Sequence, residues 1–260
     1  MSSDATVRAE TSGAKYTITS LSEQPELSDQ HQITGGSAWP EFMLHDPIAI
    51  ANWEKMMTYF AGDQLSMLVD NQIAAVINMA PINVESDLTM LPDEGVDWGV
   101  EKSVADHERG IQPNSMLGLQ VVVSKTFRGR NLSVAATREM IEHAKKRNCD
   151  YVLLPVRPSG KHAYPLISME QYISWENSSG LPLDGWLRVH KRLGGKIIRI
   201  CHRSMTIPGT IAKWENWTGQ KFPGSGQYIV PFALNPIDID TEQNTGHYVE
   251  PNIWVVHHVK

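Results

Sequence analysis

The sequence has 260 residues, of which 41% are hydrophobic and 20% are charged, enough for one large or two small domains with a real core. A formal net charge of −6 excludes a general basic field, so we expect neither nucleic acid nor an anionic membrane as partner. The polar start lacks the apolar stretch of a secretory signal, and no apolar run approaches the roughly 20 residues of a spanning helix. The only two cysteines lie beside apolar runs and are interpreted as buried, so we expect a cytoplasmic protein.

The first predicted elements are, in chain order, a polar tail (1–14), a strand (16–20), a helix (47–61) and an antiparallel hairpin (65–80). Asp46 is a good N-cap for the helix, and Pro47 suits its first position. Asp70 and Asn71 separate the two apolar runs of the hairpin and favour a two-residue turn. We therefore expect an antiparallel sheet in the first third of a single domain, 15–260.

The middle of the chain predicts a strand, crossover helix, strand unit. Its elements are a strand (116–124), a helix (132–147) and a second strand (151–156), and such a pair of strands is expected to be parallel and right-handed. The remaining predicted elements are helices at 98–109, 168–176 and 186–193, a strand at 196–202 and closing strands in the C-terminal tail. The whole predicts an α/β fold with a mixed sheet, insertions at about 81–114 and 157–186, and a C-terminal extension.

The turn between this first strand and the helix is a candidate anion site. A helix N-terminus presents unpaired N–H groups and the positive end of the helix dipole, which favour a phosphate. Arg128, Gly129 and Arg130 lie in the turn, where arginine can form forked hydrogen bonds and glycine permits close approach. The alternative is a plain connector with two solvated arginines.

The order strand, FRGRNLS turn, helix, YVLLPV strand and WLRVHKRLGGKII resembles the GCN5-related N-acetyltransferase (GNAT) superfamily. That family's turn reads R/Q-x-x-G-x-G/A and wraps the pyrophosphate of coenzyme A with backbone amides. Arg128 matches the leading position, while Asn131 and Ser133 take the two small positions; Asn131 departs from glycine but tolerates a left-handed backbone. The resemblance implies acetyl-CoA or another acyl-CoA as co-substrate. The residues it assigns to the cofactor are Val121, Val122 and Val123 beside the pantetheine arm and Phe127, Arg128, Gly129, Arg130, Asn131, Leu132 and Ser133 around the pyrophosphate.

A second part of the resemblance concerns the proton returned to sulfur. VHKRLGG, 189–195, is similar to the family's LYEKLGF, which places His190 where a Tyr often protonates the departing thiolate. Imidazole can do this near neutral pH, and a packed or capping histidine is the alternative. Tyr164 is a second candidate acid.

The base and the acceptor site are assigned to the two insertions. The central strand carries no carboxylate, and Gln120 is its only long polar side chain, so Glu101 in the first insertion is our choice of base, with a bound water as the alternative. The second insertion leaves the carboxyl end of a strand, where ligands sit in open α/β sheets. There Arg157, Lys161 and His162 are expected to grip a carboxylate or phosphate of the substrate.

These patterns predict an acyl-CoA-dependent N-acyltransferase that acts on a small polar acceptor. The basic residues Arg157 and Lys161 of the second insertion indicate an acidic acceptor. Two alternatives stay open: a related enzyme that hydrolyses or decarboxylates an acyl thioester or takes it from a carrier protein, and a catalytically silent acyl-CoA-binding module. The histidines form no metal-spaced cluster, so no metal site is expected. The sequence does not determine the oligomeric state, and a homodimer is compatible with it.

Overall fold

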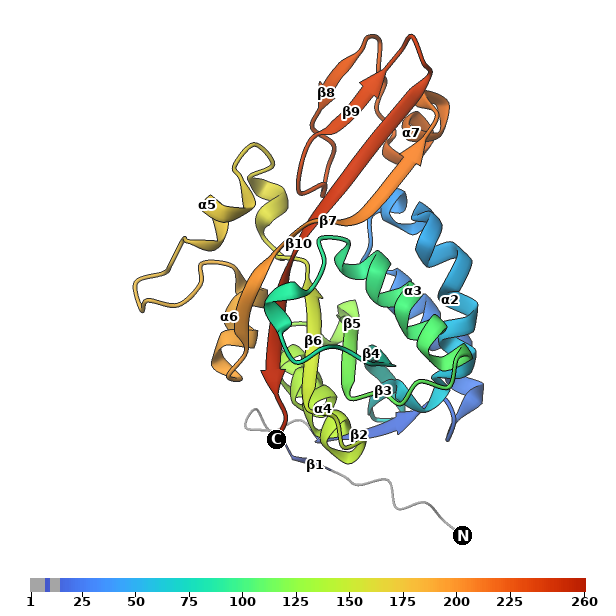
Figure 1. Cartoon of the computed structure of the whole chain (residues 1–260), viewed down its shortest axis with the longest axis vertical. Coiled ribbons are helices and arrows are strands. Elements are labelled where there is room, and N and C mark those ends of the chain that lie inside the picture. Colours follow the sequence, from blue (N-terminus) through green and yellow to red (C-terminus); the bar gives the residue numbers. More distant parts are fainter. Residues whose placement is uncertain (1–7, 10–14) are drawn as a thin grey trace.

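A computed structural model describes residues 8–9 and 15–260. They form one mixed sheet with the strand order β1-β2-β3-β4-β5-β6-β10-β9-β8, and β7 also pairs with β10 (Figure 1). The strands are β1 (Arg8–Ala9), β2 (Lys15–Ser20), β3 (Gln64–Val69), β4 (Gln72–Ile82), β5 (Ser115–Val123), β6 (Tyr151–Val156), β7 (Lys196–Gly209), β8 (Gly226–Tyr228), β9 (Ile237–Asp240) and β10 (Thr245–His258). Most of the expected tail lies outside the described residues, but β1 pairs with β2.

The predicted strand, helix, strand unit is confirmed. β5 and β6 are parallel, and α4 (Leu132–Lys146) connects them, whereas the other pairs in the sheet are antiparallel. The predicted hairpin is confirmed as β3 and β4, with Asp70 (φ 50°) and Asn71 (φ 59°) in its turn. Positive φ at both positions gives the turn the twist that two-residue hairpins require.

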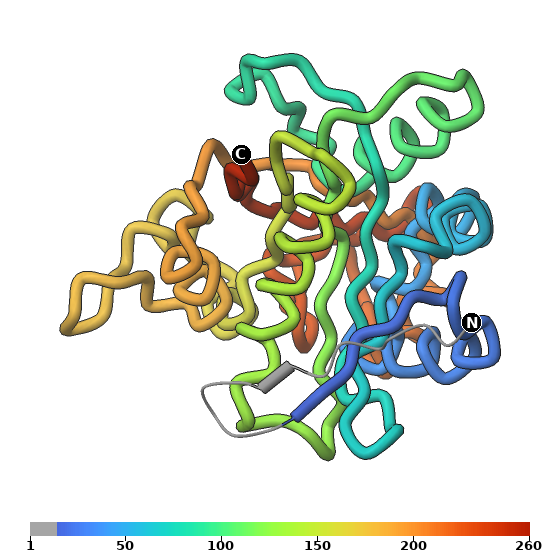
Figure 2. Tube along the Cα trace, turned by 90° about the horizontal axis from the view of Figure 1, so that it is seen from below, coloured from blue at the N-terminus to red at the C-terminus, as the bar shows by residue number. Residues whose placement is uncertain are grey.

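Helices cover both faces of the sheet (Figure 2). The helices are α1 (Ser28–Gly36), α2 (Pro47–Tyr59), α3 (Gly95–Glu108), α4, α5 (Met169–Ile173), α6 (Gly185–Arg192) and α7 (Ile211–Thr218). On one face, Met140 of α4 and Leu187 of α6 pack with Met116 of β5 in the main core. On the other, Met56 of α2 and Val100 of α3 pack together in a second cluster. The alternation of apolar side chains along each strand supplies both contacts.

The boundaries of two predicted elements are wrong. β7 was expected at 196–202 but continues to Gly209, because it pairs with β10 in a ribbon that rises beyond the sheet (Figure 1). The helix expected at 168–176 ends at Ile173, since the chain then turns into a bridge between Glu176 and Pro182. The long-range pairing of β7 with β10 leaves no local signal in the sequence.

The ribbon carries the C-terminal extension. α7, β8 and β9 pack at its far end around Trp214 and Tyr248, which are fully buried. Phe42 and Met43, from the short 3-10 helix η2 (Glu41–His45) before α2, join this cluster. The extension is thereby fastened to the N-terminal helices. None of the helices in the described ranges is long and apolar enough to span a bilayer.

Candidate active site

A cavity of about 880 Å³ opens where two parallel strands part. β5 and β6 are paired only from Ser115 to Leu117 and from Tyr151 to Leu153. The pairing of β5 with β4 shifts between Gly118 and Gln120, which leaves Leu119 as an extra residue in a β-bulge. Beyond the bulge the two strands diverge, and side chains of both line the cavity. The backbone edges of β5 and β6 that face each other are therefore unpaired beyond Leu117 and Leu153.

Gly118 lies at the point of divergence, where there is little space for a side chain. A Cβ at this position would stand 2.7 Å from Met140 Sδ of α4 and 2.9 Å from Leu154 Cδ2 of β6. Both distances are shorter than real Cβ contacts, so a larger residue here would force the ends of the Met140 and Leu154 side chains to shift.

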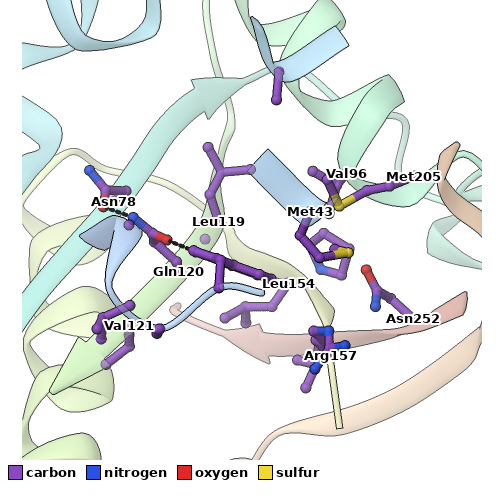
Figure 3. A pocket seen from close by; sticks show the side chains of 18 of the residues that line it. Met43, Asn78, Val96, Leu119, Gln120, Val121, Leu154, Arg157, Met205 and Asn252 are labelled. Carbon is purple, nitrogen blue, oxygen red and sulfur yellow. Dashed lines mark hydrogen bonds between the residues drawn. The ribbon is translucent and has the colours of Figure 1, made fainter. Parts of the chain in front are cut away.

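Residues from many parts of the chain line the cavity: α1, α2 and the segment between them, β4, the start of α3, β5 and the turn after it, β6 and the loop after it, α6, the loop at Phe232, and the ribbon. The apolar wall in Figure 3 includes Met43, Val96, Leu119 and Met205. Polar groups lie at two separate ends, with Asn78 and Gln120 at one and Arg157 and Asn252 at the other. A cavity with an apolar wall and a few placed polar groups is typical of a small-molecule site.

The predicted anion turn adjoins this cavity. Gly129 (φ 79°) and Asn131 (φ 57°, ψ 18°) have left-handed backbones, and Asn131 is the N-cap of α4. Within the described residues, the N–H groups of Gly129, Asn131, Leu132 and Ser133 meet no acceptor. Arg128 and Ser133 line the cavity. Donors of this kind, with a guanidinium beside them, fit a pyrophosphate.

The other predicted cofactor residues have different placements. Phe127 and Leu132 are buried in the core and anchor the turn, and the Arg130 guanidinium lies 5.2 Å from the centre of the Phe127 ring. Val121 and Val122 line the cavity, whereas Val123 packs against the core.

A hydrogen-bonded chain of uncharged side chains forms the Gln120 end. Trp39 Nε1 donates to Gln120 Oε1 at 2.7 Å, and Gln120 Nε2 donates to Asn78 Oδ1 at 2.6 Å. Asn78 Nδ2 then donates to His31 Nε2 at 2.9 Å, so His31 Nδ1 carries the proton and donates to Ser66 Oγ, also at 2.9 Å. Burial lowers the pKa of His31 to about 4, which keeps the ring neutral.

A buried ion pair forms the other end. Arg157 Nε lies 2.6 Å from Oε1 of Glu250, whose side chain is fully buried in β10. Tyr248 donates its hydroxyl proton to Oε2 of Glu250, and Asn252 Nδ2 lies 3.3 Å from Oε1. Arg157 Nη2 also donates to the carbonyl oxygen of Phe232 at 2.5 Å. The carboxylate thus has partners on both oxygens, and it fixes the direction of the guanidinium.

Comparisons with known proteins find a similar sequence and a similar fold. The arginine N-acetyltransferase avaD of Aspergillus versicolor is 28% identical over 277 aligned positions, which cover 93% of this chain and 93% of that protein. The loading GNATL domain of CurA from Lyngbya majuscula matches with a TM-score of 0.56, 16% identity and coverage of 94% of this chain and 98% of that one. The chain therefore has the fold of a GNAT-like domain, and its sequence is similar to that of an N-acetyltransferase. No family model matches the sequence.

A further structure belongs to a mosquito protein. The arylalkylamine N-acetyltransferase 7 of Aedes aegypti, described as putative, has a TM-score of 0.47 and 10% identity, with coverage of 98% of this chain and 93% of that one.

The GNAT resemblance placed His190 at the thiol, but the structure turns it away from the cavity. The side chain is 1% exposed, and its Nδ1 lies 3.0 Å from His257 Nε2 of β10. Burial, with His257 beside it, lowers the pKa of His190 to about 3. Trp186 and Val189, on another side of the same helix, line the cavity instead. This placement corrects the expected role of His190 as the acid.

Three further expected site residues lie elsewhere. Tyr164 is exposed and packs against the rings of Tyr172 and Trp175 without lining the cavity. Glu101 is on the exposed side of α3 and does not line the cavity either. Lys161 is fully buried, and its Nζ donates to two backbone carbonyls, so it holds loops together. Of the expected substrate-binding residues, Arg157 and His162 line the cavity.

The carboxyl groups of Asp46 and Asp97 interact with each other. Asp46 caps α2 through Ala49 N at 2.7 Å, and Asp97 of α3 accepts from Thr206 N of β7 at 3.2 Å. Asp46 Oδ2 and Asp97 Oδ1 are buried and meet no donor within the described ranges, so we expect the two carboxyl groups to share one proton. Burial and the Asp46 charge raise the pKa of Asp97 to about 8.

Several site residues escaped the sequence analysis. His31, Trp39, Phe232, Glu250 and Asn252 come from segments that lie far from the recognised motif along the chain. Glu250 alone had a local signal, a carboxylate between the apolar residues Val249 and Pro251 in a closing strand. Among the described residues, no group of three or more His, Cys, Asp or Glu is placed to hold a metal ion.

Proposed function

We propose that the chain is an acyl-coenzyme A-dependent N-acyltransferase that acylates the amine of a small polar acceptor bearing a carboxylate. The observation that carries the proposal is the single cavity that runs from the anion turn, along the open edge of β5, to the Arg157 end. A bound acyl-CoA supplies the activated acyl group as a thioester. The relative avaD is named an arginine N-acetyltransferase, so arginine is the first acceptor to test.

The turn binds the co-substrate at its pyrophosphate. The N–H groups of Gly129, Asn131, Leu132 and Ser133 would donate to the phosphate oxygens, and Arg128 adds a charge. From there the open edge of β5 leads past Val121 to the bulge at Leu119. An extended chain with amide groups, such as pantetheine, suits a strand edge with unpaired N–H and C=O groups.

The Arg157 end would hold the acceptor. Arg157 Nη1 has no partner within the described residues, because Glu250 and Phe232 engage the other two nitrogens. The free nitrogen suits an acceptor carboxylate. Asn252 Nδ2 donates to Pro251 O at 2.8 Å. Asn252 Oδ1 has no partner among the described residues and could accept a hydrogen bond from an amine N–H. An amine held between these groups and the strand edge would lie beside the thioester. This positioning lowers the entropic cost of bringing the two reactants together.

The test is thiol release from acetyl-CoA with a panel of amines. Reactions with arginine, other amino acids, agmatine or an arylalkylamine would be compared with a reaction that contains no amine. The masses of the products would be measured by mass spectrometry. We expect release that depends on an amine and a product heavier by one acetyl group. Equal release without an amine would support hydrolysis. Binding of acetyl-CoA without any release would support a silent binding module.

A further inference from the structure

The deprotonation of the amine has no assigned base. An amine attacks a thioester only through a free electron pair, so its ammonium form must first lose a proton. Five titratable side chains line the cavity, and they are His31, Arg128, Arg157, His162 and Glu250. The two arginines stay protonated and cannot accept a proton.

Two of the remaining three side chains, His31 and Glu250, already have polar partners at both of their titratable atoms. Both ring nitrogens of His31 are hydrogen-bonded, and Nε2 already accepts from Asn78. Both oxygens of Glu250 are engaged by Arg157, Tyr248 and Asn252. A proton accepted by either side chain would break a buried network. Neither is therefore placed to serve as the base.

His162 differs from both. It is half-buried at the cavity, and within 8–9 and 15–260 neither ring nitrogen has a hydrogen-bond partner. Its one ring contact is with Phe232, at 5.4 Å between centroids and an interplanar angle of 41°. Imidazole is the side chain that can take and release a proton near neutral pH.

Phe232, whose ring contacts His162, has a backbone conformation that costs free energy. Phe232 has a φ of 69°, a strained conformation for an aromatic residue, and its side chain is 57% exposed. Arg157 binds its carbonyl oxygen. Lys161 Nζ donates to Leu234 O at 2.7 Å and to Tyr164 O at 2.9 Å, and it thereby ties the loop around Phe232 to the turn that contains His162. An exposed aromatic residue with a strained backbone, in a loop whose carbonyls are held by Arg157 and Lys161, indicates a functional position.

We infer that His162 is the general base that takes the proton from the acceptor amine, with Phe232 as its positioning residue. The inference rests on the proposed function. Among the described residues, the charged groups around this turn are Arg157, Lys161, Asp184 and Glu250, and Asp184 accepts from Gly160 N at 2.7 Å.

The proton balance is complete without another reactant. His162 takes one proton from the ammonium group, and the freed electron pair forms the C–N bond at the thioester carbonyl carbon. The C–S bond breaks with its electrons on sulfur, and the second proton of the nitrogen passes to the thiolate. Protonated His162 then releases its proton to solvent at the mouth of the cavity.

The test compares His162→Gln with His247→Gln, an exposed histidine of β10 that does not line the cavity. General bases contribute about 100-fold or more, so we expect at least that loss in kcat/KM for H162Q with an aliphatic amine, and no loss for H247Q. The dissociation constant for acetyl-CoA, measured by calorimetry, should stay within about twofold in both, because the turn at 128–133 is untouched.

An acceptor that needs no base separates chemistry from folding. With hydroxylamine, which is unprotonated at neutral pH, the loss in H162Q should shrink to about 10-fold or less, and imidazole should partly restore His162→Gly. A loss of equal size with both acceptors, or full activity in H162Q, would overturn the inference. Wild-type protein inactive with every amine would instead count against the proposed function.

Discussion

Arg157 at the end of β6 lies 2.6 Å from the carboxylate of Glu250, a fully buried residue of β10. The pair joins the loop after β6 to the ribbon, and through the carbonyl oxygen of Phe232 it also fixes the loop above the cavity. An ion pair of this kind is costly to break, because removal of one partner leaves the other charge without compensation.

Glu250→Gln should therefore lower the free energy of unfolding by about 3 kcal/mol. The measurement is urea denaturation followed by tryptophan fluorescence. Glu142→Gln is the matched control, since Glu142 pairs with Lys145 at 2.8 Å on the surface and should cost no more than about 0.5 kcal/mol. Equal losses of unfolding free energy in the two variants would show that the buried pair contributes no more to stability than a surface pair.

Arg128→Ala should weaken the binding of acetyl-CoA about 10-fold or more, because a charge-assisted contact to phosphate is lost. Calorimetric titration at fixed salt measures the effect. Lys213→Ala removes the same charge from the exposed side of α7 and should leave the affinity unchanged. An unchanged dissociation constant in R128A would remove this arginine from the binding site.

Asn131→Ala and Asn131→Gly test the left-handed backbone of the turn. Alanine at φ 57° should cost about 1 kcal/mol of unfolding free energy and should also weaken acetyl-CoA binding. Glycine adopts this conformation freely and should preserve both properties. If the alanine variant binds as tightly as the glycine variant, the conformation of Asn131 does not matter for the cofactor.

The shared proton of Asp46 and Asp97 predicts a dependence of stability on pH. The pKa of Asp97 is raised from 3.8 to about 8, so the folded protein keeps a proton that the unfolded chain releases. Unfolding therefore releases a proton between these values, and stability falls as the pH rises from about 4 to about 8. Above pH 8 both carboxylates ionise and repel each other.

Asp97→Asn should flatten this slope. The amide can donate to Asp46 and still accept from Thr206, so the variant should gain at least about 1 kcal/mol relative to wild type between pH 5.5 and pH 8.5. Thermal or urea unfolding at both pH values measures the gain, with the exposed Asp238→Asn as control. Parallel pH profiles of D97N and wild type would contradict the shared proton.

The features predicted correctly are those with a local signal. The β5 strand, the turn and α4 are contiguous, so the pattern of apolar residues, Arg128 and Asn131 identified them together. The Asp46 cap and the Asp70-Asn71 turn also depend on neighbouring residues alone.

The missed features depend on contacts between distant segments. Glu250 meets Arg157 only because β10 inserts between β6 and β7, and His190 is buried because the same strand brings His257 against α6. Lys161, expected at the substrate, instead folds under its own loop to reach the carbonyl of Leu234. No local pattern reports which side of a loop or helix such pairings will bury.

The central claim is that the space between the diverging strands β5 and β6 binds an acyl-CoA. Hydrogen–deuterium exchange with and without acetyl-CoA tests it most directly, because backbone amides report their own protection. We predict slower exchange at 118–123 and 128–134, with smaller changes at 154–157 and none in α7. Unchanged exchange in the β5 edge and the turn at saturating acetyl-CoA, or protection confined to another region, would contradict the account.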